Sequence, residues 1–352
     1  MKLRPALPSV CIVSPALADA NNGNWQTAAR WQRFLAPLSK VLIAPAWDGR
    51  PFNALIALHA RRSAESIASF RAAHANLPIA LVLTGTDLYR DLVFDSAAQH
   101  ALECASHVVV LQDEGLQLLA PSVAAKARCI VQSAPHLKRR DVARRGTTFV
   151  AVGHLRDEKD PATLMLATQH LPDAPPMRVV HIGRPLDAAL GEQALQTMQA
   201  CPHYRWLGDQ PHAAARRWIA RAQALVHMSR MEGGANVVIE ALRSGVPVLA
   251  SRIDGNVGLL GRDYAGYFEV GDAAALAELM QRFASDTEFA AQLWAQCALR
   301  EPRFAPPVER AAVRALLADM LAARKLAAAP TITLTDPLLT VTHAPLPSEP
   351  TP

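Results

Sequence analysis

Short apolar runs alternate with spacers of helix length along this 352-residue chain, and this alternation constrains the fold more than any other feature. Continuous Val/Ile/Leu runs are typical of parallel strands that are buried on both faces. In the first half they occupy residues 9–16, 40–46, 53–60, 79–85, 107–112 and 127–133, with helices expected over 25–38 and 64–73. The pattern predicts an α/β unit with a doubly wound parallel sheet.

The same alternation restarts after residue 146. Strands are expected over residues 147–155, 177–183, 204–208, 224–229, 246–251 and 266–270. Helices are expected from Pro161, where proline suits a first helical turn, and over 216–222, 234–244 and 273–285. The length also fits two domains, so a second doubly wound unit is predicted.

Two further segments follow the second unit. Residues 308–325 place five apolar side chains at helical spacing on one face: Val313, Leu316, Leu317, Met320 and Leu321. The last residues are rich in proline and threonine, which predicts a flexible tail. The predicted organisation is therefore 1–145, 146–300, a C-terminal helix within 301–326, and a tail over 327–352.

The composition excludes several classes of protein. Apolar residues make up 51% and charged residues 19%, which excludes a wholly disordered chain. No run reaches the roughly 18 apolar residues of a membrane span. The basic and then apolar N-terminus mimics a signal peptide, but three prolines interrupt it, so a first buried strand and a cytoplasmic protein are expected. The five cysteines lack a CxxC pair, which predicts neither disulfides nor a zinc site.

The net charge of +5 is unevenly distributed. Residues 1–145 carry a net +7 and the remainder a net −2. Much of the excess lies in the run KRRDVARR at 138–145, which is compatible with nucleic-acid binding but lacks interleaved aromatic residues. A solvated linker between domains is the preferred interpretation, and the other positive charges suit an anionic small-molecule substrate rather than a nucleic acid.

The segment 227–260 holds the densest set of candidate binding residues. A predicted strand ends at Ser229, and a turn containing Glu232, Gly233, Gly234, Ala235 and Asn236 opens a predicted helix. Free backbone N–H groups and the positive helix end favour an anion such as a diphosphate there.

Glu232 and Glu240 are eight residues apart, just over two helical turns, so both are expected along one face. Glu240 is a candidate partner for a ribose diol and Glu232 for a sugar hydroxyl. Two carboxylates at this spacing are also common on solvated helix faces, so the spacing alone does not decide between the two interpretations.

The flanking residues favour the binding interpretation. The order Ser–x–x–Glu–Gly, helix, Glu-Ala, Gly245-Val246-Pro247-Val248 and Asp254-Gly255 resembles the nucleotide-sugar site of GT-B glycosyltransferases of the family-4 type. This resemblance implies two Rossmann-like domains that face each other across a cleft. It also implies a donor bound mainly to the second domain and a last helix that crosses back to the first.

A second segment, Gly153-His154-Leu155-Arg156-Asp157-Glu158-Lys159, resembles the start of the second domain in the same family. There an arginine and a lysine bind the donor diphosphate. Lys159 matches the lysine, whereas His154 occupies the arginine position. Either His154 takes a weaker role or Arg156 compensates.

Three polar loops follow predicted strands of the first half, where ligands bind in open α/β sheets. The residues expected to meet the acceptor there are Asn22, Asn24, Arg61, Arg62, Thr86 and Arg90, with Asp19, His59 and Asp87 as candidate catalytic groups. Gly23 stands where GT-B enzymes often have a glycine that faces the donor phosphates. The dense arginines suit a small, multiply charged acceptor.

Segments at 15–31, 57–67, 83–91, 153–161 and 229–261 together resemble the selenosugar synthases of selenoneine biosynthesis, a branch of the GT-B enzymes. This resemblance implies a UDP-sugar donor, with UDP-N-acetylglucosamine expected, and selenophosphate as the acceptor. The implied products are a 1-seleno-sugar, UDP and phosphate.

No Asp-x-Asp motif occurs in the sequence, so neither a metal nor another cofactor is expected. Two other functions remain open: a GT-B enzyme acting on a hydroxyl acceptor, and a non-catalytic protein that binds a nucleotide sugar. An epimerase on the same fold is disfavoured by the Glu-x7-Glu pattern. The oligomeric state is not predicted.

Overall fold

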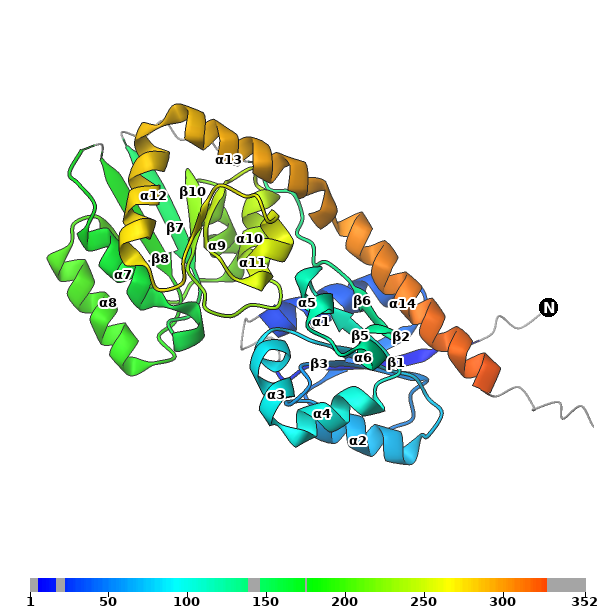
Figure 1. Cartoon of the computed structure of the whole chain (residues 1–352). Helices are drawn as coiled ribbons and strands as arrows, with labels where there is room; N and C mark the ends of the chain where they lie inside the picture. The colour runs from blue at the N-terminus through cyan, green and yellow to red at the C-terminus, as the bar shows by residue number, and fades with distance from the viewer. Residues whose placement is uncertain (1–5, 17–22, 139–145, 175, 328–352) are drawn as a thin grey trace, which may run out of the picture.

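The structure is a computed structural model that describes residues 6–16, 23–138, 146–174 and 176–327. Asp19, Asn22, residues 139–145 of the basic run and the tail beyond residue 327 lie outside the described residues. Two parallel sheets, each covered by helices, form two domains that face each other (Figure 1).

The first sheet has the order β2-β1-β3-β4-β5-β6, with every neighbouring pair parallel. Its strands are β1 (Ser9–Val13), β2 (Lys40–Ala44), β3 (Ala54–Leu58), β4 (Ile79–Val82), β5 (His107–Val110) and β6 (Ala127–Cys129). All six lie within the expected runs. The interpretation of the N-terminal run as a buried strand is therefore confirmed.

Alternate side chains of β1 explain why that run is apolar throughout. Val10 and Ile12 pack into the core under one face of the sheet, and Cys11 and Val13 pack into the core under the other. Because side chains alternate across a strand, a strand covered on both faces must be apolar at every position.

The helices of the first domain surround this sheet. They are α1 (Gly23–Leu35), α2 (Ala64–Ala73), the π-helix η2 (Asp87–Asp91), α3 (Leu92–Phe94), α4 (Ser96–Cys104), α5 (Glu114–Gln117) and α6 (Pro121–Ala124). Helix α2 has the expected bounds. Helix α1 begins two residues earlier than expected, which brings Gly23 into its first turn.

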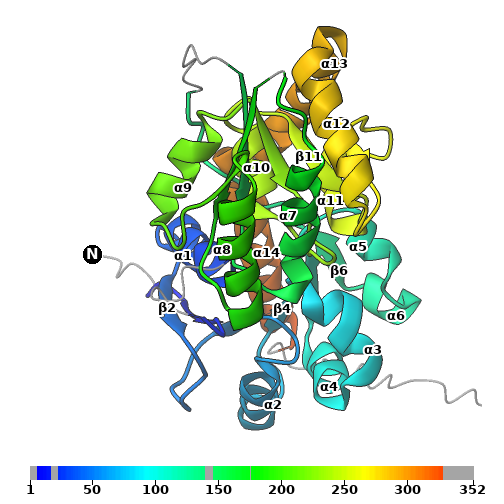
Figure 2. The same cartoon turned by 90° about the vertical axis from the view of Figure 1, so that its left-hand side faces the viewer.

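The second sheet has the order β12-β11-β10-β7-β8-β9 and is also parallel. Its strands are β7 (Thr147–Val152), β8 (Met177–Ile182), β9 (Tyr204–Trp206), β10 (Ala224–His227), β11 (Val248–Ser251) and β12 (Tyr267–Phe268). Its helical elements are η3 (Asp157–Lys159), α7 (Pro161–Gln169), α8 (Ala188–Ala200), α9 (His212–Ile219), α10 (Asn236–Leu242), α11 (Asp254–Leu260), α12 (Ala273–Ser285), α13 (Thr287–Arg300) and η4 (Glu301–Phe304). Figure 2 shows α7 and α8 side by side over one face of this sheet.

The last helix, α14 (Pro306–Ala327), returns to the first domain (Figure 1). Val313, Leu316, Leu317 and Met320 are buried with Trp31 of α1 in the same core cluster. The apolar stripe expected on this helix therefore packs under the first sheet, and it anchors the end of the second domain to the first.

All five cysteines are free thiols, as the sequence predicts.

Candidate active site

A cavity of about 390 Å³ lies between the two domains, within the usual range for small-molecule sites. Ten of its lining residues belong to the first domain and to the segment that follows β6, and the rest belong to the second domain. Both walls consist of strand ends and helix amino ends, which is where open α/β sheets bind ligands.

The amino ends of α1 and α10 approach each other across this cavity. Gly23 and Asn24 of α1 line it, as do Ala235 and Asn236 at the start of α10. A Cβ at Gly23 would lie 3.3 Å from Asn236 Nδ2. Since the first backbone N–H groups of a helix lack helical partners, the two ends together favour an anionic ligand.

His59 forms part of the first-domain wall in a constrained conformation. Its φ of 74° lies in the left-handed region, which a non-glycine residue adopts only under constraint. Its Nε2 is 3.0 Å from Thr86 Oγ1, and both residues line the cavity. Burial lowers the pKa of His59, although the Asp87 carboxylate opposes this, so a neutral imidazole faces the cavity.

Asp87 does not line the cavity, contrary to its expected catalytic contact. The side chain is fully buried, and its oxygens accept hydrogen bonds from the backbone N–H groups of Ala60, Thr84 and Gly85 at 2.8–2.9 Å. These bonds tie the loop after β3 to the loop after β4. Asp87 therefore positions the loops that carry His59 and Thr86.

Only one of the three arginines expected at the acceptor faces the cavity. Arg62 lines it, and the structure gives its guanidinium no ion-pair partner among the described residues. Arg61 instead binds Asp95 at 2.8 Å, and Arg90 binds Asp91 at 3.1 Å. Of the three arginines, Arg62 is therefore the one that lines the cavity, whereas Arg61 and Arg90 pair with carboxylates of their own domain.

The turn after β10 supplies the second-domain wall. Glu232 lies in this turn, four residues before α10 begins, so Glu232 and Glu240 do not share a helix face as expected. Both line the cavity nonetheless, together with Gly234, Ala235 and Asn236, whereas Gly233 does not.

One oxygen of Glu232 collects three donors. Lys159 Nζ and Ser229 Oγ both bind Oε1, and His227 Nε2 lies 3.4 Å from it. Burial acts to raise the pKa of Glu232, but the Lys159 ammonium and the His227 hydrogen bond outweigh it and hold that pKa well below its usual range. A fixed carboxylate that stays ionised is suited to accept hydrogen bonds from sugar hydroxyls.

Glu240 lies in α10 and is held from the neighbouring helix. His212 Nε2 is 2.6 Å from Glu240 Oε1, and Arg216 Nε is 4.0 Å from the same oxygen. His212 also lines the cavity, although no motif in the sequence pointed to it.

The cations around Gly153 differ from the expected pair. His154 lines the cavity, but burial lowers its pKa, so it brings no positive charge at neutral pH. Arg156, Lys159 and Arg184 line the cavity as cations. Arg184, which follows β8, was not anticipated from the sequence, and it lines the cavity together with Arg156.

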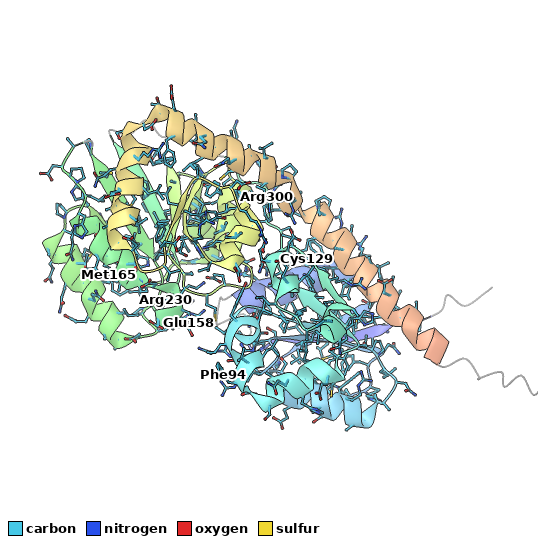
Figure 3. All side chains as sticks on the ribbon, viewed as in Figure 1. Phe94, Cys129, Glu158, Met165, Arg230 and Arg300 are labelled. Atoms are coloured by element: carbon cyan, nitrogen blue, oxygen red, sulfur yellow. The ribbon has the colours of Figure 1, made fainter. Side chains whose placement is uncertain are left out.

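The two domains touch beside the cavity through two glycines. A Cβ at Gly233 would lie 2.6 Å from the backbone nitrogen of Gly85, and one at Gly85 would lie 2.8 Å from the nitrogen of Gly233. Real Cβ contacts are not this short, so only glycines allow the two loops to meet. At the edge of the second domain that faces the first, the Glu158 carboxylate pairs with Arg90 at 3.6 Å. The backbone carbonyl oxygen of Glu158 accepts a hydrogen bond from the Arg230 backbone N–H, and Figure 3 labels both residues.

The second domain is similar in sequence to a known family. Residues 137–296 match the family described as glycosyl transferases group 1. The second domain is therefore similar to the domains of this family. No curated protein sequence matches the chain.

Solved structures show the same arrangement of both domains. Sucrose-phosphate synthase from Thermosynechococcus elongatus superposes with a TM-score of 0.73 at 16% identity, covering 90% of this chain and 100% of that one. Anabaena Alr3699/HepE, in complex with UDP-glucose, gives 0.70 at 13% identity, covering 89% and 100%. The pneumococcal O-GlcNAc transferase GtfA, in complex with UDP and GlcNAc, gives 0.63 at 14%, covering 76% of this chain and 57% of that one. The S. aureus TarM complex covers 76% and 55%. These likenesses establish the GT-B fold.

The described part of the chain forms neither a cluster of metal-ligating side chains nor a membrane-spanning helix. No group of three or more His, Cys, Asp or Glu side chains is placed to hold a metal ion there. Among the same residues, none of the helices has the length and hydropathy needed to cross a bilayer.

Proposed function

We propose that the protein is a glycosyltransferase that binds a nucleotide-sugar donor in the cavity between its domains. The observation that carries this proposal is the convergence of two helix amino ends, Lys159, Arg156 and Arg184 on one cavity next to the ionised Glu232. The similarity of the second domain to the group 1 glycosyltransferases supports it. So do the neighbouring structures, several of which contain UDP or a UDP-sugar.

Each part of the donor has a suitable partner on the second domain. Arg156, Lys159 and Arg184 are placed to neutralise a diphosphate together with the start of α10. Glu240 is held by His212 and is assigned to the ribose diol, and Glu232 to a sugar hydroxyl. As the bond to the sugar breaks, charge develops on the leaving UDP, and these fixed cations stabilise it without a metal.

For the acceptor we propose selenophosphate, and UDP-N-acetylglucosamine for the donor. Arg62, neutral His59 and Thr86 on the opposite wall suit a small anion. Selenium attacks the anomeric carbon and the bond from that carbon to the UDP oxygen breaks. Water then cleaves the Se–P bond, so the products are a 1-seleno-sugar, UDP and phosphate.

The test is an assay of UDP release by the full chain. UDP-N-acetylglucosamine is incubated with selenophosphate, thiophosphate or simple alcohols, and UDP and the sugar product are followed by mass spectrometry. The proposal predicts a selenium-containing sugar and release that depends on selenophosphate. Two variants of His59 then separate a role in orienting the acceptor from a role in loop stability. His59→Gln keeps a polar group beside Thr86, whereas His59→Ala removes it.

Other outcomes identify the alternatives. UDP release with alcohols alone would assign the protein to ordinary hydroxyl acceptors and remove the selenosugar assignment. Tight binding of UDP-sugar with no UDP release in any mixture would indicate a non-catalytic binding protein.

A further inference from the structure

Gln132 lies on the segment that leaves β6 toward the second domain. The residue is 2% exposed and lines the cavity. Its Oε1 is buried and has no hydrogen-bond partner among the described residues. A buried carbonyl oxygen without a donor costs free energy, so its presence beside a ligand site needs a physical reason.

The orientation of this amide follows from its neighbour Thr27. The Thr27 hydroxyl donates its single hydrogen to the backbone oxygen of Gly23 at 2.8 Å. Toward Gln132 it can therefore only accept, which it does from Nε2 at 2.5 Å. The amide NH2 must face Thr27, and the carbonyl oxygen must face away from it.

Gly234 keeps space open beside that oxygen. A Cβ at Gly234 would lie 3.0 Å from Gln132 Oε1 and 2.9 Å from Leu111 Cβ. Gly234 and Leu111 both line the cavity. The backbone of Gly234 is not in the left-handed region. Glycine is therefore required there by the lack of room for a Cβ and not by the backbone conformation.

We propose that Gln132 Oε1 accepts a hydrogen bond from an O–H or N–H group of the sugar that is transferred. An ionised phosphate has no hydrogen to donate, and the ribose diol is assigned to Glu240, which leaves the transferred sugar and the uracil N–H as the groups of the donor that can satisfy this oxygen. Gly234 belongs to the same turn as Glu232, so the sugar lies between the two acceptors. This inference rests on the proposed nucleotide-sugar site and adds a specificity-determining contact from the other domain.

The test compares the affinities of UDP and UDP-N-acetylglucosamine by calorimetry on the full chain. Gln132→Met has a similar volume but no acceptor. It should leave the Kd of UDP within about twofold and weaken UDP-N-acetylglucosamine about tenfold, the usual size of one hydrogen bond to a ligand. Gly234→Ala should act in the same direction, because the methyl group fills the space beside the oxygen.

Thr27 provides a matched pair of controls. Thr27→Ser keeps the hydroxyl and should bind both ligands normally. Thr27→Val lets the amide rotate, so it should lose part of the preference for UDP-sugar over UDP. If Gln132→Met fails to fold, these two variants still test whether Gln132 Oε1 accepts a hydrogen bond from the sugar.

The outcomes separate the two levels of the proposal. An unchanged ratio of UDP-sugar to UDP affinity in Gln132→Met and Thr27→Val, or equal weakening of both ligands, would overturn the inference and make Gln132 a purely structural residue. Failure of the unaltered protein to bind any UDP-sugar would instead overturn the proposed function, and this contact with it.

Discussion

Arg30 Nε lies 2.6 Å from Glu309 Oε2, and this buried ion pair joins α1 at the cavity to α14 at the end of the chain. The same carboxylate accepts hydrogen bonds from Trp31 Nε1 at 2.8 Å and from the backbone N–H and hydroxyl of Ser133. Ser133 is next to Gln132. One carboxylate therefore fixes the helix that lines the cavity, the crossing segment and the returning helix.

Replacement of Glu309 should destabilise the protein strongly. Glu309→Gln leaves the Arg30 guanidinium buried without a counter-charge, which typically costs about 3 kcal/mol or more. The free energy of unfolding in urea measures this. The exposed neighbour Arg310 is a control, because Arg310→Gln should change stability by less than about 0.5 kcal/mol. A similar small effect at both positions would show that the pair does not anchor α14.

Substitution of Gly233 should block the approach of the domains. In Gly233→Ala the new Cβ would sit 2.5 Å from the backbone carbon of Thr84, so the two loops cannot meet. Small-angle scattering should show a more open chain, and UDP release should fall by at least about tenfold. Gly271→Ala meets no atom within 4 Å but places an alanine at a φ of 83°, so it controls for the backbone strain of losing a glycine far from this contact and should keep UDP release near normal. A normal rate in Gly233→Ala would mean that this contact is not needed for activity.

Acid should weaken the second domain through His181. This histidine is buried, its Nδ1 is 2.7 Å from the Tyr204 hydroxyl, and burial lowers its pKa to about 4. Since its pKa is near 6.5 in the unfolded chain, the unfolded chain binds the proton more tightly, and stability falls as the pH drops from 6.5 to about 4.

The predicted loss from His181 is at most roughly 3 kcal/mol, measured as the free energy of unfolding across that interval. His181→Phe should flatten the decline. The exposed His100 is the control, since His100→Gln should leave the pH dependence intact. Equal slopes in all three proteins would contradict the assignment.

A gain of charge at His154 should tighten nucleotide binding. Burial lowers the pKa of His154 and keeps it neutral, whereas His154→Arg would add a permanent cation beside Lys159. UDP affinity should rise severalfold and become more sensitive to salt, and His154→Gln should show neither change. Calorimetry at two salt concentrations makes the comparison, and weaker binding by His154→Arg would place the diphosphate elsewhere.

The strands could be predicted from the sequence because burial on both faces leaves an unbroken apolar run, as in β1 and β3. The helices were harder to predict from the sequence. Helix α11 contains Gly255 and Gly258, which weaken a helical prediction, yet both are required because a Cβ there would meet Glu232 and Gln112.

The candidate site was predictable where it lies in a motif. Glu232, Glu240 and Lys159 stand in recognisable segments and do line the cavity. Arg61 and Arg62 are neighbours in sequence, and only the fold shows that Arg62 faces the ligand space. Gln132 and Arg184 carry no local signal, since their roles arise from contacts between distant segments.

Titration of UDP-N-acetylglucosamine into the full chain, with Lys159→Met as the partner experiment, tests the central claim most directly. The account predicts one site per chain for the unaltered protein and at least about tenfold weaker binding for the variant. The variant removes a cation assigned to the donor diphosphate and the ion pair that fixes Glu232. The absence of binding by the unaltered protein, or equal affinity in the two proteins, would contradict the assignment of this cavity to a nucleotide sugar.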